Sequence, residues 1–289
     1  MPLDMTACKA WIGKSAEEVD IITPRLLSEY RVTFEPFLAT IPGAEVPLGF
    51  HWCLSPVLAP ISELGRDGHP AKGGFLPPVP LPRRMWAGGS IDYAAPLKPG
   101  DHVHRRSIIV SIDAKQGRSG PLCFVGIRHD FHTERGLALS ELHNIVYRDE
   151  TPVTRESGPA IPPATATASV AADQAPLESS WTVTPTPTML FRYSALTFNG
   201  HRIHYDQPYA TTVEGYDGLV VHGPMQATLM LNLAAASRGA IPRRFTYRGL
   251  APLIAGQPFL LRLQHAADSL RCVTQVAGGP INMQGEATW

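Results

Sequence analysis

The sequence predicts an α+β protein in which antiparallel strands wrap around a buried helix, with one structural unit present twice. Three observations support this fold class: two short phrases that recur in the same order, one long helix that is apolar on nearly all its faces, and several strand-like segments separated by turns. A helix that is apolar all round has to be covered on every side, and a sheet folded around it provides that cover.

Two short phrases occur once in each half of the chain. TPRLLSEY at residues 23–30 matches TPTMLFRY at 186–193, and APLKPG at 95–100 matches APLIAG at 251–256. Because the matches keep their order and their approximate separation, they indicate a duplicated unit.

The duplication divides the chain into two units joined by a linker. The segment from Thr151 to Pro176 is rich in proline, alanine and threonine, and proline resists helix and central-strand positions. We therefore expect a first unit at residues 1–150, a linker at 151–180 and a second unit at 181–289.

The first phrase of each pair predicts the start of a helix, and the second predicts a turn that leads into a strand. Thr23 and Thr186 can cap a helix, and the prolines that follow them stand where a missing N–H costs nothing. Further apolar runs bounded by turn residues predict strands at 101–112, 119–134, 137–149, 257–266 and 270–279, with residues 114–120 as a loop.

A long buried helix is predicted from Gly223 to Gly239. Pro224 suits its first turn, and Gly239 suits its end. Its apolar surface is interrupted by three polar residues, Gln226, Thr228 and Asn232.

Composition excludes several classes of protein. The 289 residues have a net charge of zero and no Lys/Arg-rich run, which argues against nucleic-acid and anionic-membrane partners. No apolar run approaches the ~18 residues of a membrane span, and the first residues lack the pattern of a signal peptide, so we expect a cytoplasmic protein. None of the four cysteines stands in a C-x-x-C spacing, which argues against a zinc or redox motif.

The stretch LTFNGHRIHYD at residues 196–206 concentrates groups that transfer protons. Two histidines, an asparagine, an arginine and an aspartate lie within eleven positions. A metal site built from His201, His204, His222 and Asp206 is an alternative. In a strand His201 and His204 would face opposite sides, so such a site would require a local turn. We therefore predict no metal.

Three segments carry a resemblance to a known family: FRYSALTFNGHRIHYD at 191–206, GLVVHGPMQATLM at 218–230 and LPPVPLPRRMWAGG at 76–89. Over essentially its whole length the chain resembles the MaoC-like hydratases and dehydratases. Within that family it is similar to the branch of itaconyl-CoA and mesaconyl-C4-CoA hydratases and mitochondrial 3-hydroxyacyl-thioester dehydratases. The resemblance implies a tandem (double) hot-dog fold, each unit an antiparallel sheet wrapped around a helix.

The resemblance also implies a reaction. We expect water to be added reversibly to the double bond of a short branched dicarboxylic enoyl-CoA, such as itaconyl-CoA or mesaconyl-C4-CoA, with no cofactor beyond the coenzyme A of the substrate. The alternatives are a 3-hydroxyacyl-ACP or -CoA dehydratase of fatty-acid synthesis, a hot-dog thioesterase and a non-catalytic protein that binds acyl thioesters. Two units in one chain already mimic a dimer of single units, and a homo-oligomer of the whole chain is compatible with the sequence.

The family motif G-D-x-N-P-x-H matches this chain only in part. His204 corresponds to the motif's histidine, whereas its aspartate falls on Asn199, which cannot act as a base. The motif's asparagine and proline fall on His201 and Arg202.

Hydration of an enoyl thioester requires a base, an acid and donors for the thioester oxygen. His204 is the predicted base, because an imidazole titrates near neutral pH. Asn199 is expected either to orient the water or to form a turn before a glycine. Asp206 would share a strand face with His204 and either supply a carboxylate, orient the imidazole or remain a surface charge.

The predicted long helix supplies the expected oxyanion site. His222 and Gly223 stand at its N-terminus, where free N–H groups and the helix dipole favour negative charge, and His222 can alternatively act as a cap. The resemblance assigns the thioester carbonyl to the Gly223 amide. Expected substrate contacts are Arg84, Trp86, Tyr193, His201 and Arg202. Trp86 is equally suited to core packing, and the arginines suit an acidic substrate.

Overall fold

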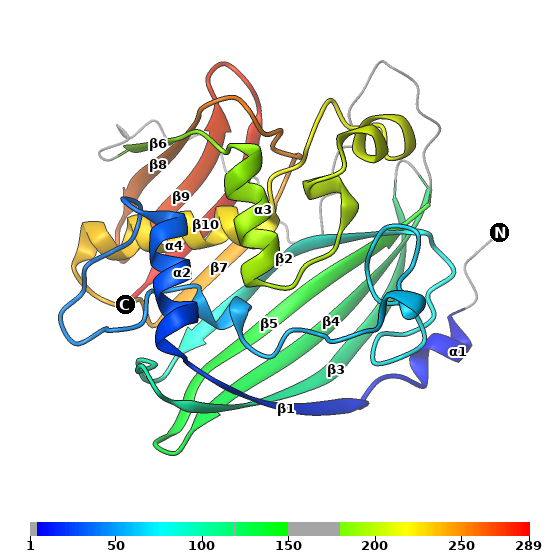
Figure 1. Cartoon of the computed structure of the whole chain (residues 1–289), viewed down its shortest axis with the longest axis horizontal. Coiled ribbons are helices and arrows are strands. Elements are labelled where there is room, and N and C mark those ends of the chain that lie inside the picture. Colours follow the sequence, from blue (N-terminus) through cyan, green and yellow to red (C-terminus); the bar gives the residue numbers. More distant parts are fainter. Residues whose placement is uncertain (1–4, 118–119, 150–179) are drawn as a thin grey trace.

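The structure is a computed structural model that describes residues 5–117, 120–149 and 180–289 (Figure 1). In these ranges one antiparallel sheet contains the strands β1 (Ser15–Ile21), β2 (Arg83–Tyr93), β3 (His102–Gly117), β4 (Gly120–Thr133), β5 (Gly136–Arg148), β6 (Ser180–Val183), β7 (Arg244–Gly249), β8 (Phe259–Ala266), β9 (Ser269–Val276) and β10 (Ile281–Thr288). The α-helices are α1 (Thr6–Lys9), α2 (Pro24–Phe34), α3 (Pro187–Leu196) and α4 (Gly223–Arg238).

The strand order repeats between the two halves of the chain. The sheet runs β1-β3-β4-β5-β2-β7-β10-β9-β8-β6, so each half contributes five adjacent strands. Counted from the outer edge of the sheet inward, the order is β1-β3-β4-β5-β2 in the first half and, equivalently, β6-β8-β9-β10-β7 in the second. The halves meet where β2 pairs antiparallel with β7, with Gly89 opposite Tyr247. The predicted α+β class with antiparallel strands is confirmed. The predicted linker, except for Ser180, lies outside the described residues.

The first repeated phrase starts a helix in both halves, as predicted. The Thr23 hydroxyl accepts a hydrogen bond from the Leu26 N–H at 3.2 Å, and the Thr186 hydroxyl accepts one from the Met189 N–H at the same distance. Each cap satisfies a backbone donor that has no partner within its helix.

The second repeated phrase makes the same long-range contact in both halves. The Gly100 N–H donates to the carbonyl of Ile22 at 2.9 Å, and the Gly256 N–H donates to the carbonyl of Pro185 at 3.0 Å. Ile22 and Pro185 each precede the capping threonine of their half. The two phrases therefore meet in space twice, which is direct structural evidence for the duplication.

The predicted long helix is confirmed as α4, which ends at Gly239 in the left-handed conformation. It packs against β2, β7, β8, β9 and β10, and it lies in a core cluster to which both halves contribute (Figure 1). Two of its polar residues have hydrogen-bond partners: the Thr274 hydroxyl donates to Gln226 at 2.8 Å, and the Asn232 amide donates to the Leu48 carbonyl at 3.0 Å.

The expectation of a wrapped helix in each unit is wrong for the first unit. Residues 36–82 contain only the short 3₁₀ helices η1 (Phe50–Cys53) and η2 (Ile61–Glu63) where the second unit has α4. Proline and glycine are frequent in this segment, and both disfavour a helix interior. The segment instead packs on α4, where the Ala39 N–H donates to the Asn232 side-chain oxygen at 3.1 Å.

Five predicted strands correspond to β3, β4, β5, β8 and β9. The loop predicted at 114–120 is too long, because β3 continues to Gly117 and β4 begins at Gly120. Sequence analysis did not identify β1, β2, β6, β7 and β10. No helix in the described part of the chain is long and apolar enough to cross a bilayer.

Candidate active site

The histidine-rich stretch is not extended. It comprises the end of α3, a turn and a 3₁₀ helix η3 (Arg202–His204). Asn199 shapes the turn: its N–H donates to the Ser194 carbonyl at 2.8 Å, and its side-chain oxygen accepts from the His201 N–H at 3.0 Å. Of the two roles expected for Asn199, these contacts agree with the turn-forming one.

His204 is held in one tautomer in a buried position. Its Nδ1 lies 2.7 Å from the Val220 carbonyl oxygen, which can only accept, so Nδ1 carries the proton and Nε2 has the free lone pair. The residue is 6% exposed, and burial lowers the pKa of the imidazole to about 4. His204 is therefore neutral near pH 7 and able to accept a proton at Nε2.

His204 lies against the N-terminus of α4, as expected. Its ring stacks on His222, with centroids 3.6 Å apart and planes 20° apart. His222 is fully buried, and its Nε2 lies 2.8 Å from the Ser194 hydroxyl. His222 thus supports the ring of His204 and is shielded from a ligand. It is therefore a residue that positions His204, and the expectation that it belongs to the reacting groups is corrected.

Gly223 is the first residue of α4, where the backbone N–H has no partner within the helix. It is partly exposed, and a Cβ at this position would collide with the indole of Trp86. Trp86 stacks on Tyr247 with centroids 4.5 Å apart and planes 9° apart. Trp86 therefore forms a wall directly beside the expected oxyanion site.

Glu141 on β5 anchors the aromatic side chains behind Trp86. Its carboxylate accepts from the Tyr247 hydroxyl at 2.6 Å and from the Trp52 indole N–H at 3.0 Å. Burial would raise the pKa of this carboxyl, but His51, whose Nε2 lies 3.6 Å from the carboxylate, and other nearby histidines lower it below its usual value. Glu141 is thus an ionised group that fixes the wall, and sequence analysis did not identify it.

Asp206 does not accompany His204. Because the stretch is not a strand, Asp206 turns away and pairs with Arg202 at 2.8 Å, and it also accepts from the Tyr209 N–H at 3.0 Å. Arg202 additionally donates to the Arg66 carbonyl at 3.1 Å. The expected roles of Asp206 beside His204 and of Arg202 on the substrate are therefore corrected to structural ones.

Tyr193 does not contact a substrate site. It is fully buried on the inner face of α3, with its ring edge-on to Phe34 and to His222. Tyr30 occupies the corresponding buried position of the first repeated phrase. The tyrosine of both phrases is a core residue, and the expectation of a substrate contact is wrong.

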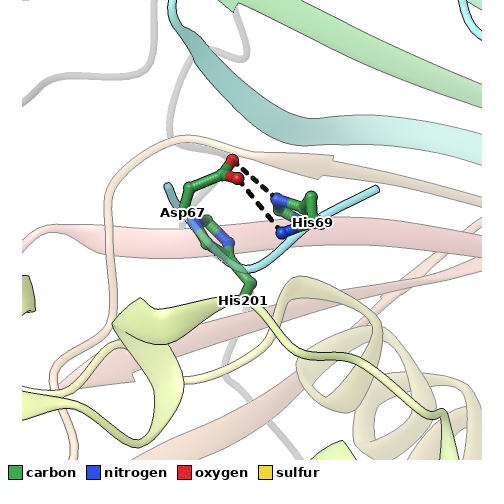
Figure 2. Close-up of side chains that lie close together, drawn as sticks. All are labelled: Asp67, His69 and His201. Carbon is green, nitrogen blue, oxygen red and sulfur yellow. Dashed lines mark hydrogen bonds and ion pairs between the residues drawn. The ribbon is translucent and has the colours of Figure 1, made fainter. Parts of the chain in front are cut away.

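Two site residues come from a loop that sequence analysis did not single out. Asp67 and His69 lie next to His201, and the rings of His69 and His201 have centroids 4.1 Å apart (Figure 2). The charge of Arg84 acts on all three residues and contributes to the lowered pKa of each. The sequence GRDGHP at residues 65–70 could have indicated this site, because it places an aspartate and a histidine among turn residues.

Asp67, His69 and His201 also have the spacing of a metal site, since one ligand atom of each lies within 4.8 Å of the others. The alternative set considered from the sequence does not form, because Asp206 is paired with Arg202.

Lowering the pH below neutrality is expected to destabilise the protein. Burial lowers the pKa of His69, His201, His204 and His222. The unfolded chain therefore binds more protons than the folded chain once the pH falls below ~6.5, and stability is lost as the pH falls toward each folded pKa. For His204, a folded pKa of about 4 amounts to about 2 kcal/mol by pH 5.

Urea unfolding at pH 7.5, 6.5 and 5 measures this effect. A free energy of unfolding that stays level or rises between pH 6.5 and pH 5 would contradict it.

Comparison with known proteins agrees with this geometry. The family model of hydroxyacyl-thioester dehydratase type 2 matches residues 49–255. The chain belongs to this family. It is 40% identical over 273 residues to a mesaconyl-C(4)-CoA hydratase of Chloroflexus aurantiacus, covering 93% of both chains. It is 29% identical over 239 residues to the mitochondrial hydroxyacyl-thioester dehydratase type 2 of Schizosaccharomyces pombe, covering 73% of this chain and 75% of that one.

Solved structures show the same fold. A MaoC-like dehydratase superimposes with a TM-score of 0.70 at 12% identity, covering 98% of this chain and 99% of that one. A Mycobacterium tuberculosis protein described as having a double hotdog fold gives a TM-score of 0.54 at 15% identity, covering 96% of both chains. The resemblance stated from the sequence is thus confirmed: the chain is a hydro-lyase with the double hot-dog fold of the MaoC-like proteins.

Proposed function

We propose that this enzyme adds water to the double bond of a short branched dicarboxylic enoyl-CoA, with mesaconyl-C4-CoA and itaconyl-CoA as the first candidates. The observation that carries the proposal is the 40% identity, over nearly the whole of both chains, to a mesaconyl-C(4)-CoA hydratase. The reaction needs only water and two proton transfers, so no redox cofactor or metal takes part in it. Coenzyme A enters as part of the substrate, and we expect the enzyme in the cytoplasm.

The geometry at the start of α4 supports a proton acceptor beside an oxyanion site. Neutral His204 would take a proton from water at Nε2 while the water oxygen attacks the β-carbon. Negative charge then develops on the thioester oxygen, and the Gly223 N–H at the positive end of α4 would donate a hydrogen bond to that oxygen. Trp86 would cover the acyl group on one side.

Arg84 supports the acidic character of the substrate. It lies on β2 close enough to Asp67, His69 and His201 for its charge to act on them. A guanidinium is suited to the distal carboxylate of a dicarboxylic acyl group or to a phosphate of coenzyme A.

A second candidate function is dehydration of 3-hydroxyacyl thioesters in fatty-acid synthesis. The 29% identity to a mitochondrial hydroxyacyl-thioester dehydratase favours it. The two functions use the same chemistry in opposite directions and differ in the acyl group, so substrate preference separates them.

One assay distinguishes these functions. The purified protein is incubated with mesaconyl-C4-CoA, itaconyl-CoA and the monocarboxylic crotonyl-CoA, while enoyl absorbance is followed and products are weighed by mass spectrometry. We expect gain of one water, with kcat/KM highest for a dicarboxylic substrate. A preference for crotonyl-CoA would favour the second function, release of free coenzyme A would indicate a thioesterase, and binding without turnover would indicate a non-catalytic protein.

A further inference from the structure

Asp67 holds His69 in a single orientation. Its two carboxylate oxygens accept hydrogen bonds from two groups of the same residue, the backbone N–H of His69 at 3.1 Å and the ring Nδ1 at 2.9 Å (Figure 2). Because Nδ1 donates to the carboxylate, the lone pair is on Nε2, and the carboxylate stabilises the imidazolium that forms when Nε2 takes a proton. Asp67 and His69 therefore form an acid–base dyad.

The loop that carries the dyad is fixed to the histidine-rich loop of the other half. The Arg202 N–H donates to the Asp67 carbonyl at 2.9 Å. Gly68 has a φ of +85°, and a Cβ there would collide with the carbonyl oxygen of Gly200. Only glycine permits this approach of the two backbones, so the first half delivers the dyad to a defined place beside His201.

The dyad stands at the outer end of a row of imidazoles. The ring centroids of His69 and His201 are 4.1 Å apart, and those of His201 and His204 are 5.4 Å apart. The side chains of Asp67 and His69 are each 22% exposed, whereas His204 is 6% exposed. His69 is thus more exposed to solvent than His204.

The reaction requires a proton donor, and the aspartate of the family motif is missing here. Asn199 replaces the motif's aspartate, and an amide neither takes nor gives a proton at neutral pH. Its side-chain oxygen already accepts the His201 N–H. Asp206, the nearest carboxylate in sequence, is bound to Arg202. The titratable groups left within the motif are His201 and His204, and the dyad is the acid–base pair that lies against His201.

We propose that His69, oriented by Asp67, is the second acid–base residue of the hydration and delivers the proton to the α-carbon. The assignment rests on the proposed function. Water loses a proton to Nε2 of His204 as its oxygen bonds to the β-carbon. The π-electron pair forms the α-carbanion, whose charge the thioester oxygen shares, and the Nε2 proton of the His69 imidazolium then bonds to the α-carbon.

The proton balance closes within the protein. After each turnover His204 holds one extra proton and His69 lacks one, and the proton returns through His201 or solvent. The charged and titratable groups that face His69 are Asp67 of its own loop, Arg84 of β2, and His201 and His204 of the opposite loop. Burial and the charge of Arg84 lower the pKa of His69, and among these groups only the Asp67 carboxylate opposes them. The imidazolium is therefore the minor form near neutral pH, and Asp67 sets how much of it remains as the pH rises.

Kinetics of His69→Gln and Asp67→Asn test the proposal. We expect His69→Gln to lower kcat about 10²- to 10³-fold with KM changed less than about threefold, the range for a lost acid–base residue. Asp67→Asn should lower kcat about tenfold or more and move the alkaline limb of the kcat/KM profile to lower pH, because the imidazolium loses its carboxylate. Imidazole in the buffer should restore part of the activity of His69→Ala.

Matched controls remove the same groups elsewhere. Glu63→Gln takes a carboxylate from the exposed chain just before the dyad loop, and His132→Gln takes an exposed histidine from β4; both should keep wild-type kinetics. Circular dichroism and the melting temperature establish that each variant is folded.

Two results would overturn the dyad: wild-type kcat in His69→Gln, or an unchanged alkaline limb in Asp67→Asn with only KM and the melting temperature altered. Wild-type turnover that is lost with EDTA and restored by Zn²⁺ would also overturn it, because a metal would take the carboxylate oxygen that His69 needs.

The test of the dyad does not depend on the proposed substrate. Turnover of any 2-enoyl-CoA by the wild type suffices for the assay, so the test still holds if the dicarboxylic substrate is wrong. Absence of turnover of every enoyl-CoA would refute the proposed function instead.

Discussion

Replacing His204 with alanine is expected to lower kcat for hydration about 10³-fold or more while the protein remains folded. The imidazole is the buried group with its lone pair on Nε2, its tautomer set by the Val220 carbonyl and its ring supported by His222. Loss of a general base typically costs 10²- to 10⁴-fold. The other imidazole at the start of α4, that of His222, is fully buried with its Nε2 on the Ser194 hydroxyl. The measurement is steady-state hydration of the best substrate, with single-turnover kinetics to isolate the chemical step.

His204→Gln refines this experiment. A glutamine fills a similar volume and its amide can donate to Val220, but it cannot accept a proton from water. It should therefore melt near the wild-type temperature and be as inactive as the alanine variant, whereas His132→Ala on the exposed side of β4 should retain full activity. Wild-type turnover by a folded His204→Gln would remove His204 from the mechanism.

Replacing Arg83 with methionine is expected to lower the free energy of unfolding by about 3 to 5 kcal/mol. Arg83 on β2 pairs with Glu214 at 3.2 Å, and both side chains are more than nine-tenths buried. The pair ties the central strand to the segment after the π-helical turn η4 (Tyr209–Val213), where Tyr209 donates to Glu214 at 3.1 Å. Removing the arginine leaves a buried carboxylate without its cation, which costs far more than loss of a surface pair.

A double-mutant cycle checks the cause. Urea unfolding of Arg83→Met, Glu214→Gln and the combined variant should show that the second substitution recovers part of the loss, because no uncompensated charge then remains. Arg244→Met is the matched control, since Arg244 pairs with Asp92 at 2.9 Å with both side chains half exposed, and its loss should cost below about 1 kcal/mol. Additive losses in the cycle, or an equal loss in the control, would show that the buried pair has no special role.

The features predicted correctly are those that depend on residues close together in the sequence. The helix starts at Thr23 and Thr186 depend on a capping hydroxyl and a proline within two residues, and α4 depends on a surface that is apolar on nearly all its faces and ends in a glycine. The choice of His204 also depended on a short motif, and its position against α4 agrees with that choice.

The errors arose where a local pattern was read without its tertiary surroundings. A strand at residues 204–206 would place Asp206 beside His204. The chain instead turns at Asn199, and Asp206 pairs with Arg202. β2 begins with two arginines and contains two glycines, so it does not have the apolar alternation of a strand, yet β5 and β7 flank it and give it its hydrogen bonds.

The sequence by itself determined the duplicated unit, the buried helix and the imidazole at its N-terminus, because caps, periodicity and a short motif act over a few residues. Only the tertiary structure decided which residues surround that imidazole. Asp67 and His69 reach His201 from more than 130 residues away, and they do so because β2 pairs with β7 and the loop at residues 65–70 packs backbone to backbone on residues 199–204. Contacts of that kind depend on the complementary shapes of two folded halves, and no window of neighbouring residues contains them.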